Sequence, residues 1–142
     1  MAAMTRAQAL AFLGAMPART GKLALVRADG APIVVPIWFA LDGEDLLFTT
    51  GAETVKGRIL RRDPRLAICV DDERPPYAFV TLHGTATLSE DIPDVRAWAT
   101  RIGGRYMGED RAQEFGARNG VAGELLVRVR IGRVRGETGV AD

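Results

Sequence analysis

The clearest pattern of hydrophobic and polar positions lies in the first third of the chain, where β-branched and aromatic runs alternate with turn residues. Asp29-Gly30 separates the first two runs, and Asp42-Gly43 opens the next turn. An Asp-Gly pair between such runs is a strong hairpin signal. Pro36 falls inside the second run and predicts an edge strand or a bulge there, because proline cannot donate to a ladder. The pattern predicts a meander of three strands near residues 22–27, 33–41 and 45–50.

Three further strands are predicted at residues 65–70, 77–89 and 124–136. Gly84 is a candidate for a bulge in the second of them. In the last one, apolar Val127, Val129 and Ile131 alternate with arginines, as expected of a strand with one buried face. Six antiparallel strands in a chain of this length predict a mainly β fold with minor α, curled into a small barrel. By length, residues 1–142 are expected to form a single domain.

Two helices are predicted between these strands. Thr54 caps a short helix that runs to about Arg62, and Pro64 ends it by holding Asp63 extended. A longer helix is predicted over residues 93–106, with one apolar stripe, and a short helix and turn follow it.

The N-terminal segment allows two interpretations. Its single arginine, apolar block and small residues resemble a weak signal peptide. Thr5 and Gln8 have the spacing of a capping box, which predicts a helix. The helix is favoured, because the charged region is weak and Gln8 interrupts the apolar block, so a cytoplasmic protein is expected.

Composition limits the classes of function. The formal net charge of the 142 residues is +1, so no general attraction to nucleic acid is expected. No apolar stretch has the length needed to span a membrane, and no membrane partner is expected. The single cysteine, Cys69, excludes an internal disulfide and a cysteine-based zinc site; it is expected to be a buried structural thiol.

The stretch "TTGAETVKGRILRRDPRL" concentrates hydroxyl groups and cations behind one predicted strand. It lacks the Gly-Lys-Ser/Thr ending of a nucleotide-hydrolase phosphate loop. A helix that begins at Thr54 nevertheless offers free amides and a positive dipole end to an anion. Lys56 lies in the first turn, where a cation is normally unfavourable, and a bound phosphate would remove that conflict.

The arginines of the same helix form a second cationic zone. Arg58, Arg61 and Arg62 share a face at i, i+3 and i+4 spacing. They are candidates to hold further negative charge, and a solvated basic helix face explains them equally well.

Other candidate chemistry is weak. His83 is the only histidine, and no acidic residue or serine stands at the spacing of a hydrolase triad, so a structural histidine is expected. Asp71 and Asp72 would project to opposite faces of a strand, so they predict a turn rather than a metal site. Trp38 and Phe39 also lie on opposite faces: one belongs to the core, and the other is free to stack on a planar ring or to pack at a subunit interface.

These blocks together resemble a known family. The ordered motifs P-x-W-F, T-T-G, T-x-K-x-R-x-L-R-R-D-P and D-D-E-R-P-P-Y, with the terminal "RVRIGRVRG", are similar to pyridoxamine-phosphate-oxidase-like proteins of the FMN-binding split β-barrel type. The closer resemblance is to the actinobacterial branch that uses the 8-hydroxy-5-deazaflavin coenzyme F420. It implies a split β-barrel of about six antiparallel strands with small flanking helices.

The resemblance also implies a cofactor site. The backbone of the second strand would lie along the deazaflavin ring, the end of the third strand and the start of the small helix would hold the phosphate, and the arginines would face the oligoglutamate tail. The residues implied are Val34, Val35, Pro36, Ile37 and Trp38 for the ring; Thr49, Thr50, Thr54, Val55 and Lys56 for the phosphate; and Arg58, Arg61 and Arg62 for the tail.

The activity implied is hydride transfer from the reduced deazaflavin to a planar conjugated acceptor, in a homodimer whose subunits share the site. No catalytic residue is assigned from the sequence, because no lone side chain is an obvious general acid. Two alternatives stay open: an oxidoreductase that uses FMN, and a protein that binds or carries the deazaflavin without turning over a substrate.

Overall fold

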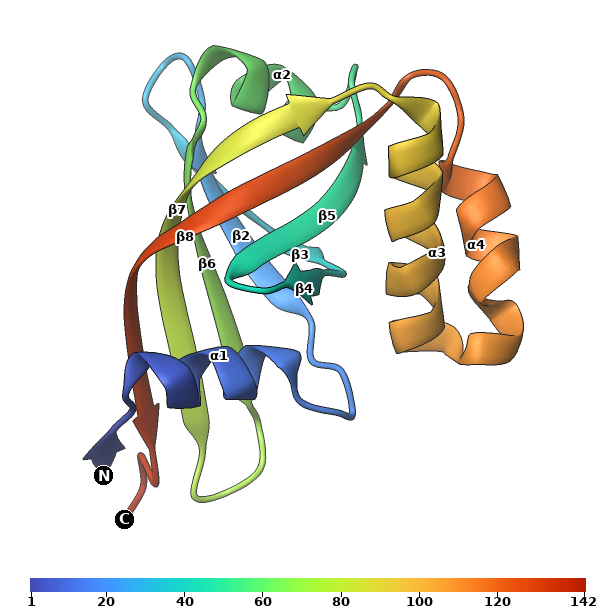
Figure 1. Cartoon of the computed structure of the whole chain (residues 1–142). Coiled ribbons are helices and arrows are strands. Elements are labelled where there is room, and N and C mark those ends of the chain that lie inside the picture. The colour runs from blue at the N-terminus through green and yellow to red at the C-terminus, as the bar shows by residue number, and fades with distance from the viewer.

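Eight strands in one sheet and four α-helices make up the computed structural model of the chain, which describes residues 1–142 (Figure 1). The strands are β1 (Ala2–Ala3), β2 (Gly21–Val26), β3 (Pro32–Ile37), β4 (Ala40–Asp42), β5 (Asp45–Gly51), β6 (Arg65–Asp72), β7 (Ala78–Ser89) and β8 (Glu124–Thr138). The helices are α1 (Arg6–Gly14), α2 (Val55–Arg62), α3 (Ile92–Met107) and α4 (Ala112–Asn119), with a 3-10 turn at Glu109–Arg111.

The sheet is antiparallel and its strand order leaves it open. The order is β3-β2-β6-β7-β8-β5-β4, with β1 paired to the end of β8. Strands β3 and β4 therefore stand at opposite ends of the hydrogen-bonded path, although only Trp38 and Phe39 separate them in the chain. The sheet curls, and the gap in its ladder lies between β3 and the β4–β5 hairpin.

The prediction of one strand over residues 33–41 is wrong, and with it the prediction of a meander. The run divides at Trp38 and Phe39, and β3 pairs with β2 alone while β4 pairs with β5. Phe39 turns its ring into the core, with 0% of its surface exposed, and its amide hydrogen-bonds the hydroxyl of Tyr106 at 3.3 Å instead of a ladder carbonyl. This division and the short strand at residues 2–3 account for eight strands in place of about six.

Two irregularities expected in the strands are confirmed. Pro36 lies in β3, which has a partner on one side only and is an edge strand. Between β7 and β8 the register shifts between Leu82 and Gly84, where the bulge was predicted.

The prediction of a turn beginning at Asp71 is wrong. Strand β6 continues through Asp71 and Asp72, because they pair with Phe79 and Ala78 of β7. Asp71 forms an ion pair with Lys22 at 2.8 Å. Hydrogen bonds from Arg74 hold the pKa of Asp72 well below its ordinary value.

The apolar side chains inside the curled sheet form the main core. A cluster of 19 buried residues joins the inner faces of β2, β5, β6, β7 and β8 to helices α1 and α2. Helix α1 contributes Ala9 and Leu13, and its start has the predicted capping box of Thr5 and Gln8. No helix of the chain has the length and apolar character needed to cross a membrane.

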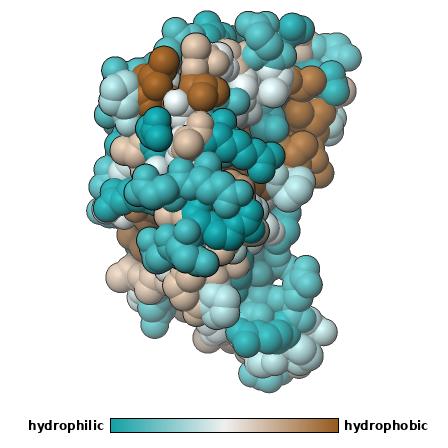
Figure 2. Space-filling model, turned by 90° about the vertical axis from the view of Figure 1, so that its right-hand side faces the viewer, coloured by the Kyte–Doolittle hydropathy of each residue, from teal (hydrophilic) through white to brown (hydrophobic).

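Helices α3 and α4 pack against each other beside the sheet, on the side where β4 and β5 lie (Figure 1). The face that this side of the molecule presents to solvent is largely hydrophilic (Figure 2). The inner face of the α3–α4 pair is apolar, and its buried residues are Val95, Ala99, Ile102 and Phe115. The pair therefore forms a wall next to the open part of the sheet.

Candidate functional site

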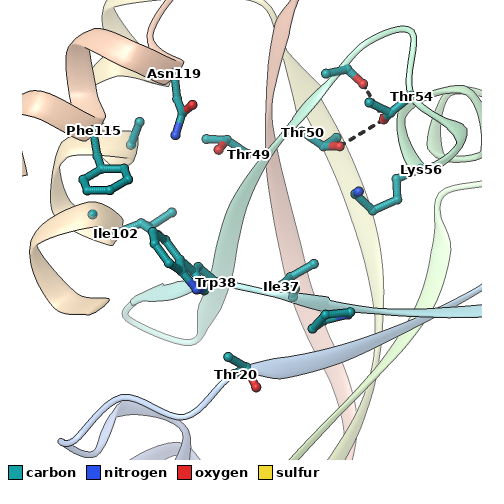
Figure 3. Close-up of a pocket in the computed structure, with 14 residues that line it drawn as sticks. Thr20, Ile37, Trp38, Thr49, Thr50, Thr54, Lys56, Ile102, Phe115 and Asn119 are labelled. Atoms are coloured by element: carbon teal, nitrogen blue, oxygen red, sulfur yellow. Dashed lines mark hydrogen bonds between the residues drawn. The ribbon is translucent and has the colours of Figure 1, made fainter. Parts of the chain in front are cut away.

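A cavity of about 580 Å³ lies at the gap in the ladder. Its sides come from four parts of the chain: the end of β3, the end of β5, the first turn of α2 and the inner face of the α3–α4 pair. Figure 3 shows Lys56 and Thr54 on one side of it, Phe115, Ile102 and Asn119 on the other, and Trp38 and Ile37 between them.

The first turn of α2 is held by hydroxyl groups. The hydroxyl of Thr54 accepts from the amide of Gly57 at 3.2 Å and donates to the carbonyl of Gly51 at 2.7 Å. The hydroxyl of Thr50 lies 3.1 Å from it. The cap leaves the amides of the first two helical residues free, and these amides and the helix dipole favour an anion at this end.

Glycine is required at position 57 by close packing. A Cβ atom there would lie 2.3 Å from the carbonyl oxygen of Gly51 and 2.8 Å from that of Ala52. Helix α2 therefore begins in direct contact with the end of β5, which brings its first turn to the cavity.

Lys56 is the only titratable side chain that lines the cavity. Its ammonium group takes part in none of the hydrogen bonds or ion pairs of the chain, whereas Arg58, two residues later, pairs with Glu53. Burial raises the pKa of Glu124, and the positive charge of Lys56 partly offsets that rise, although the two side chains form no ion pair. A cation without a counter-ion thus stands in a first helical turn, where the dipole opposes it.

Aromatic rings form the opposite part of the cavity. Trp38 stacks on Tyr106 with centroids 5.1 Å apart and 3° between the planes, and it meets Phe115 edge-on at 5.6 Å. The hydroxyl of Tyr106 donates to the carbonyl of Arg19 at 2.7 Å, and burial raises its pKa. Of the two neighbouring aromatic residues, Phe39 belongs to the core, and Trp38 is 37% exposed with one ring face covered by Tyr106 of the same chain.

The position of Phe115 depends on a second close approach. A Cβ atom at Gly103 would lie 2.4 Å from the Cβ of Phe115, so α4 can pack on α3 at this distance only because residue 103 is glycine.

The structure brings part of the predicted site together around the cavity. The residues that line it are Pro36, Ile37, Trp38, Thr49, Thr50, Thr54 and Lys56. Three of the others are apolar and lie elsewhere: Val34 is 67% exposed on the outer face of β3, Val35 packs against the core, and Val55 is exposed on α2.

The three arginines of α2 also lie outside the cavity lining. Arg58 pairs with Glu53 at 3.3 Å, Arg61 pairs with Glu90, and Arg62 donates to the carbonyl of Val26 at 2.6 Å. Each guanidinium therefore has its own partner on a different neighbouring segment. These contacts also fit the alternative of a solvated basic helix face.

Sequence reasoning missed the wall that α3 and α4 contribute. The wall residues missed are Ala99, Ile102, Gly103, Phe115 and Asn119. Thr20, which precedes β2, and Gly51, at the end of β5, also line the cavity and were missed. The apolar stripe of the longer helix is visible in the sequence. The strands β4 and β5 on which that helix packs lie far from it in the sequence. A usable signal was the set of glycines in the helical segment, which permits two helices to pack closely.

Comparisons with known proteins agree with this architecture. The family model described as pyridoxamine 5'-phosphate oxidase matches residues 7–136. A conserved hypothetical protein of Mycobacterium tuberculosis has a similar structure, with a TM-score of 0.83 and 25% identity over 96% of this chain and 86% of that one. An F420 reductase has a TM-score of 0.67 and 30% identity over 82% of this chain and 88% of its own.

An FAD-binding protein of Mesorhizobium loti shares the fold at 19% identity, with a TM-score of 0.70 and 95% of each chain covered. No curated protein matches the chain. The match over residues 7–136, together with the similar structures, shows that the chain belongs to the pyridoxamine 5'-phosphate oxidase family.

Proposed function

We propose that this chain is an oxidoreductase that binds the deazaflavin coenzyme F420 and reduces a planar conjugated acceptor with it. The observation that carries the proposal is the unpaired ammonium of Lys56 beside a capped helix start, at one end of a cavity whose other end is aromatic. This arrangement matches a molecule with a phosphate at one end and a flat ring at the other.

The residues present fit such a cofactor. Lys56 and the free first-turn amides of α2 would hold the phosphate, with Thr50 and Thr54 keeping that turn in place. The open edge of β3 at Pro36 and Ile37, with Trp38 directly after it, would support the ring. When bound, the reduced cofactor supplies a hydride from its C5 carbon. The chain binds and orients the reactants, and the α3–α4 wall excludes water from one side of the cavity.

The proton that completes the reduction comes, on this proposal, from solvent. Lys56 is the only titratable side chain in the lining, and its ammonium group would pair with the phosphate. None of the remaining lining residues can act as a general acid near neutral pH.

The 30% identity to an F420 reductase supports the deazaflavin over FMN. The exposed arginines of α2 support it also, because FMN has no acidic tail for them to meet. Arg58 and Arg61 form surface ion pairs with Glu53 and Glu90. Such pairs typically contribute only about 0–1 kcal/mol to stability. A glutamate tail is therefore able to replace them at little cost.

Cofactor titration tests the proposal. We expect the purified protein to bind F420 more tightly than FMN, and to bind F420 more weakly as the glutamate tail is shortened. The measurement is a fluorescence titration with each cofactor. Equal affinity for long-tailed and tail-less F420 would show that the arginines do not bind the tail. Tighter binding of FMN would show that FMN, not F420, is the cofactor. Binding without reduction of any acceptor would favour a carrier.

We also propose that two copies of the chain associate through the outer face of β2 and β3. On this face Val34 lies opposite Ala24, and Pro32 lies opposite Val26, which is 50% exposed. Together these side chains form an apolar patch next to the cavity residue Pro36. Patches of this kind on a sheet commonly mark an interface.

Light scattering should therefore give the mass of a dimer at micromolar concentration. Val34→Asp should shift the mass toward the monomer, because the new charge would be buried. Val121→Asp, at an exposed valine between α4 and β8, is the matched control and should stay dimeric. An unmodified protein that is monomeric with cofactor bound would contradict the proposed assembly.

A further inference from the structure

We propose that Asn119, assisted by Thr49, forms a polar subsite that selects acceptors carrying an oxygen able to accept a hydrogen bond. The inference rests on the proposed function, since it assigns a specificity-determining role to residues of the same cavity. Neither residue belongs to the phosphate end of the cavity.

The side chains of Asn119 and Thr49 have unused hydrogen-bonding groups. Both line the cavity, and neither side chain forms a hydrogen bond within the chain. Thr50 and Thr54, by contrast, lie in contact with each other at the start of α2. An asparagine amide offers two donors and one acceptor, and a threonine hydroxyl offers one donor. Polar groups facing an apolar wall without partners favour a ligand that satisfies them.

Asn119 reaches the cavity because of where α4 ends. It is the last residue of the helix, whose end is closed by the amide of Gly120 bonding the carbonyl of Gly116 at 2.8 Å. Phe115 lies one turn earlier, so the ring and the amide share a face. Figure 3 shows both side chains directed into the cavity, with Thr49 on β5 beside Asn119 and with Lys56 across the cavity.

In the proposed reaction the amide of Asn119 would stabilise the negative charge that forms on the acceptor. Addition of a hydride to a conjugated carbon moves an electron pair along the acceptor to its terminal oxygen, which gains negative charge. A hydrogen bond from the amide of Asn119 stabilises that charge, and it is stronger beside the apolar wall of Ala99, Ile102 and Phe115 than in water. A proton from solvent then completes the two-electron reduction, while the deazaflavin is left oxidised.

The experiment compares two acceptors and two readouts. 1,4-Naphthoquinone carries the required oxygen, and N-methylphenazinium is a planar hydride acceptor without one. Asn119→Leu should lower kcat/KM for the quinone by about ten- to a hundredfold. It should change the value for the phenazinium far less and leave the affinity for F420 unchanged. Gln113→Leu, on the exposed face of the same helix, is the control and should change none of these values.

Three results would overturn the inference: equal losses with both acceptors, no loss with either, or weaker binding of F420 to the variant. The last would mean that Asn119 contacts the cofactor. A protein that binds F420 but reduces neither acceptor would contradict the proposed function instead. In that case quenching of the Trp38 fluorescence by the quinone, measured with Trp98 replaced by phenylalanine, tests the subsite. Asn119→Leu should still weaken quinone binding by about tenfold, and equal binding would reject the subsite.

Discussion

Replacing Lys56 with alanine should weaken cofactor binding by about ten- to a hundredfold, because a hydrogen bond from a cation to a phosphate contributes about 1.5–3 kcal/mol. The free protein should keep its stability or gain slightly. Lys56 has no partner to lose, its charge opposes the dipole of α2, and alanine is the better helix former. Fluorescence titration measures the affinity, and thermal unfolding without cofactor measures the stability.

Two further variants make the Lys56 result specific. Lys56→Arg should retain part of the binding, since the charge stays while its geometry changes. Arg58→Ala should leave unchanged the affinity for the cofactor form that has the phosphodiester but no glutamate tail, because Arg58 lies outside the cavity. Loss of stability in free Lys56→Ala, with cofactor affinity intact, would show that the lysine is a structural residue.

Phe39→Ala should lower the free energy of unfolding by about 3–5 kcal/mol, the usual cost of removing a fully buried aromatic ring. The ring belongs to the main core, and the guanidinium of Arg105 lies 5.0 Å from its centroid. Urea unfolding of both proteins measures the difference.

Trp38→Ala is the informative comparison for Phe39→Ala. The indole is partly exposed and is held mainly by Tyr106 and Phe115, so its loss should cost less stability and should act mainly on the cavity. The assignment of Phe39 to the core and Trp38 to the site would be wrong if the tryptophan variant were the less stable of the two.

Features fixed by neighbouring residues could be predicted from the sequence. The start of α2 at Thr54 and its end before Pro64 follow from capping and from the restriction that proline puts on Asp63, which is extended with φ −137°. The capping box of α1 and the bulge at Gly84 are likewise local. These local signals also place Lys56 in the first turn of its helix, as the structure has it.

Features that depend on distant contacts could not be predicted. The run from residue 33 to residue 41 shows no signal that it ends at Trp38 and Phe39. Its division there involves Tyr106, a residue of α3 whose hydroxyl accepts a hydrogen bond from the amide of Phe39. The partner of Arg61, Glu90, lies 29 residues away. The strand order and the packing of α3 and α4 beside the gap also depend on contacts between residues that are far apart in the sequence.

The open edge of β3 has a consequence for solubility. An unpaired strand edge normally invites a strand from another molecule and so promotes aggregation. Here Pro32 and Pro36 occupy two of the six positions of β3, and neither can donate a main-chain hydrogen bond to an incoming strand. The same edge can thus remain accessible to a small flat molecule without pairing with a strand of another chain. Replacing both prolines should therefore favour fibrillar association.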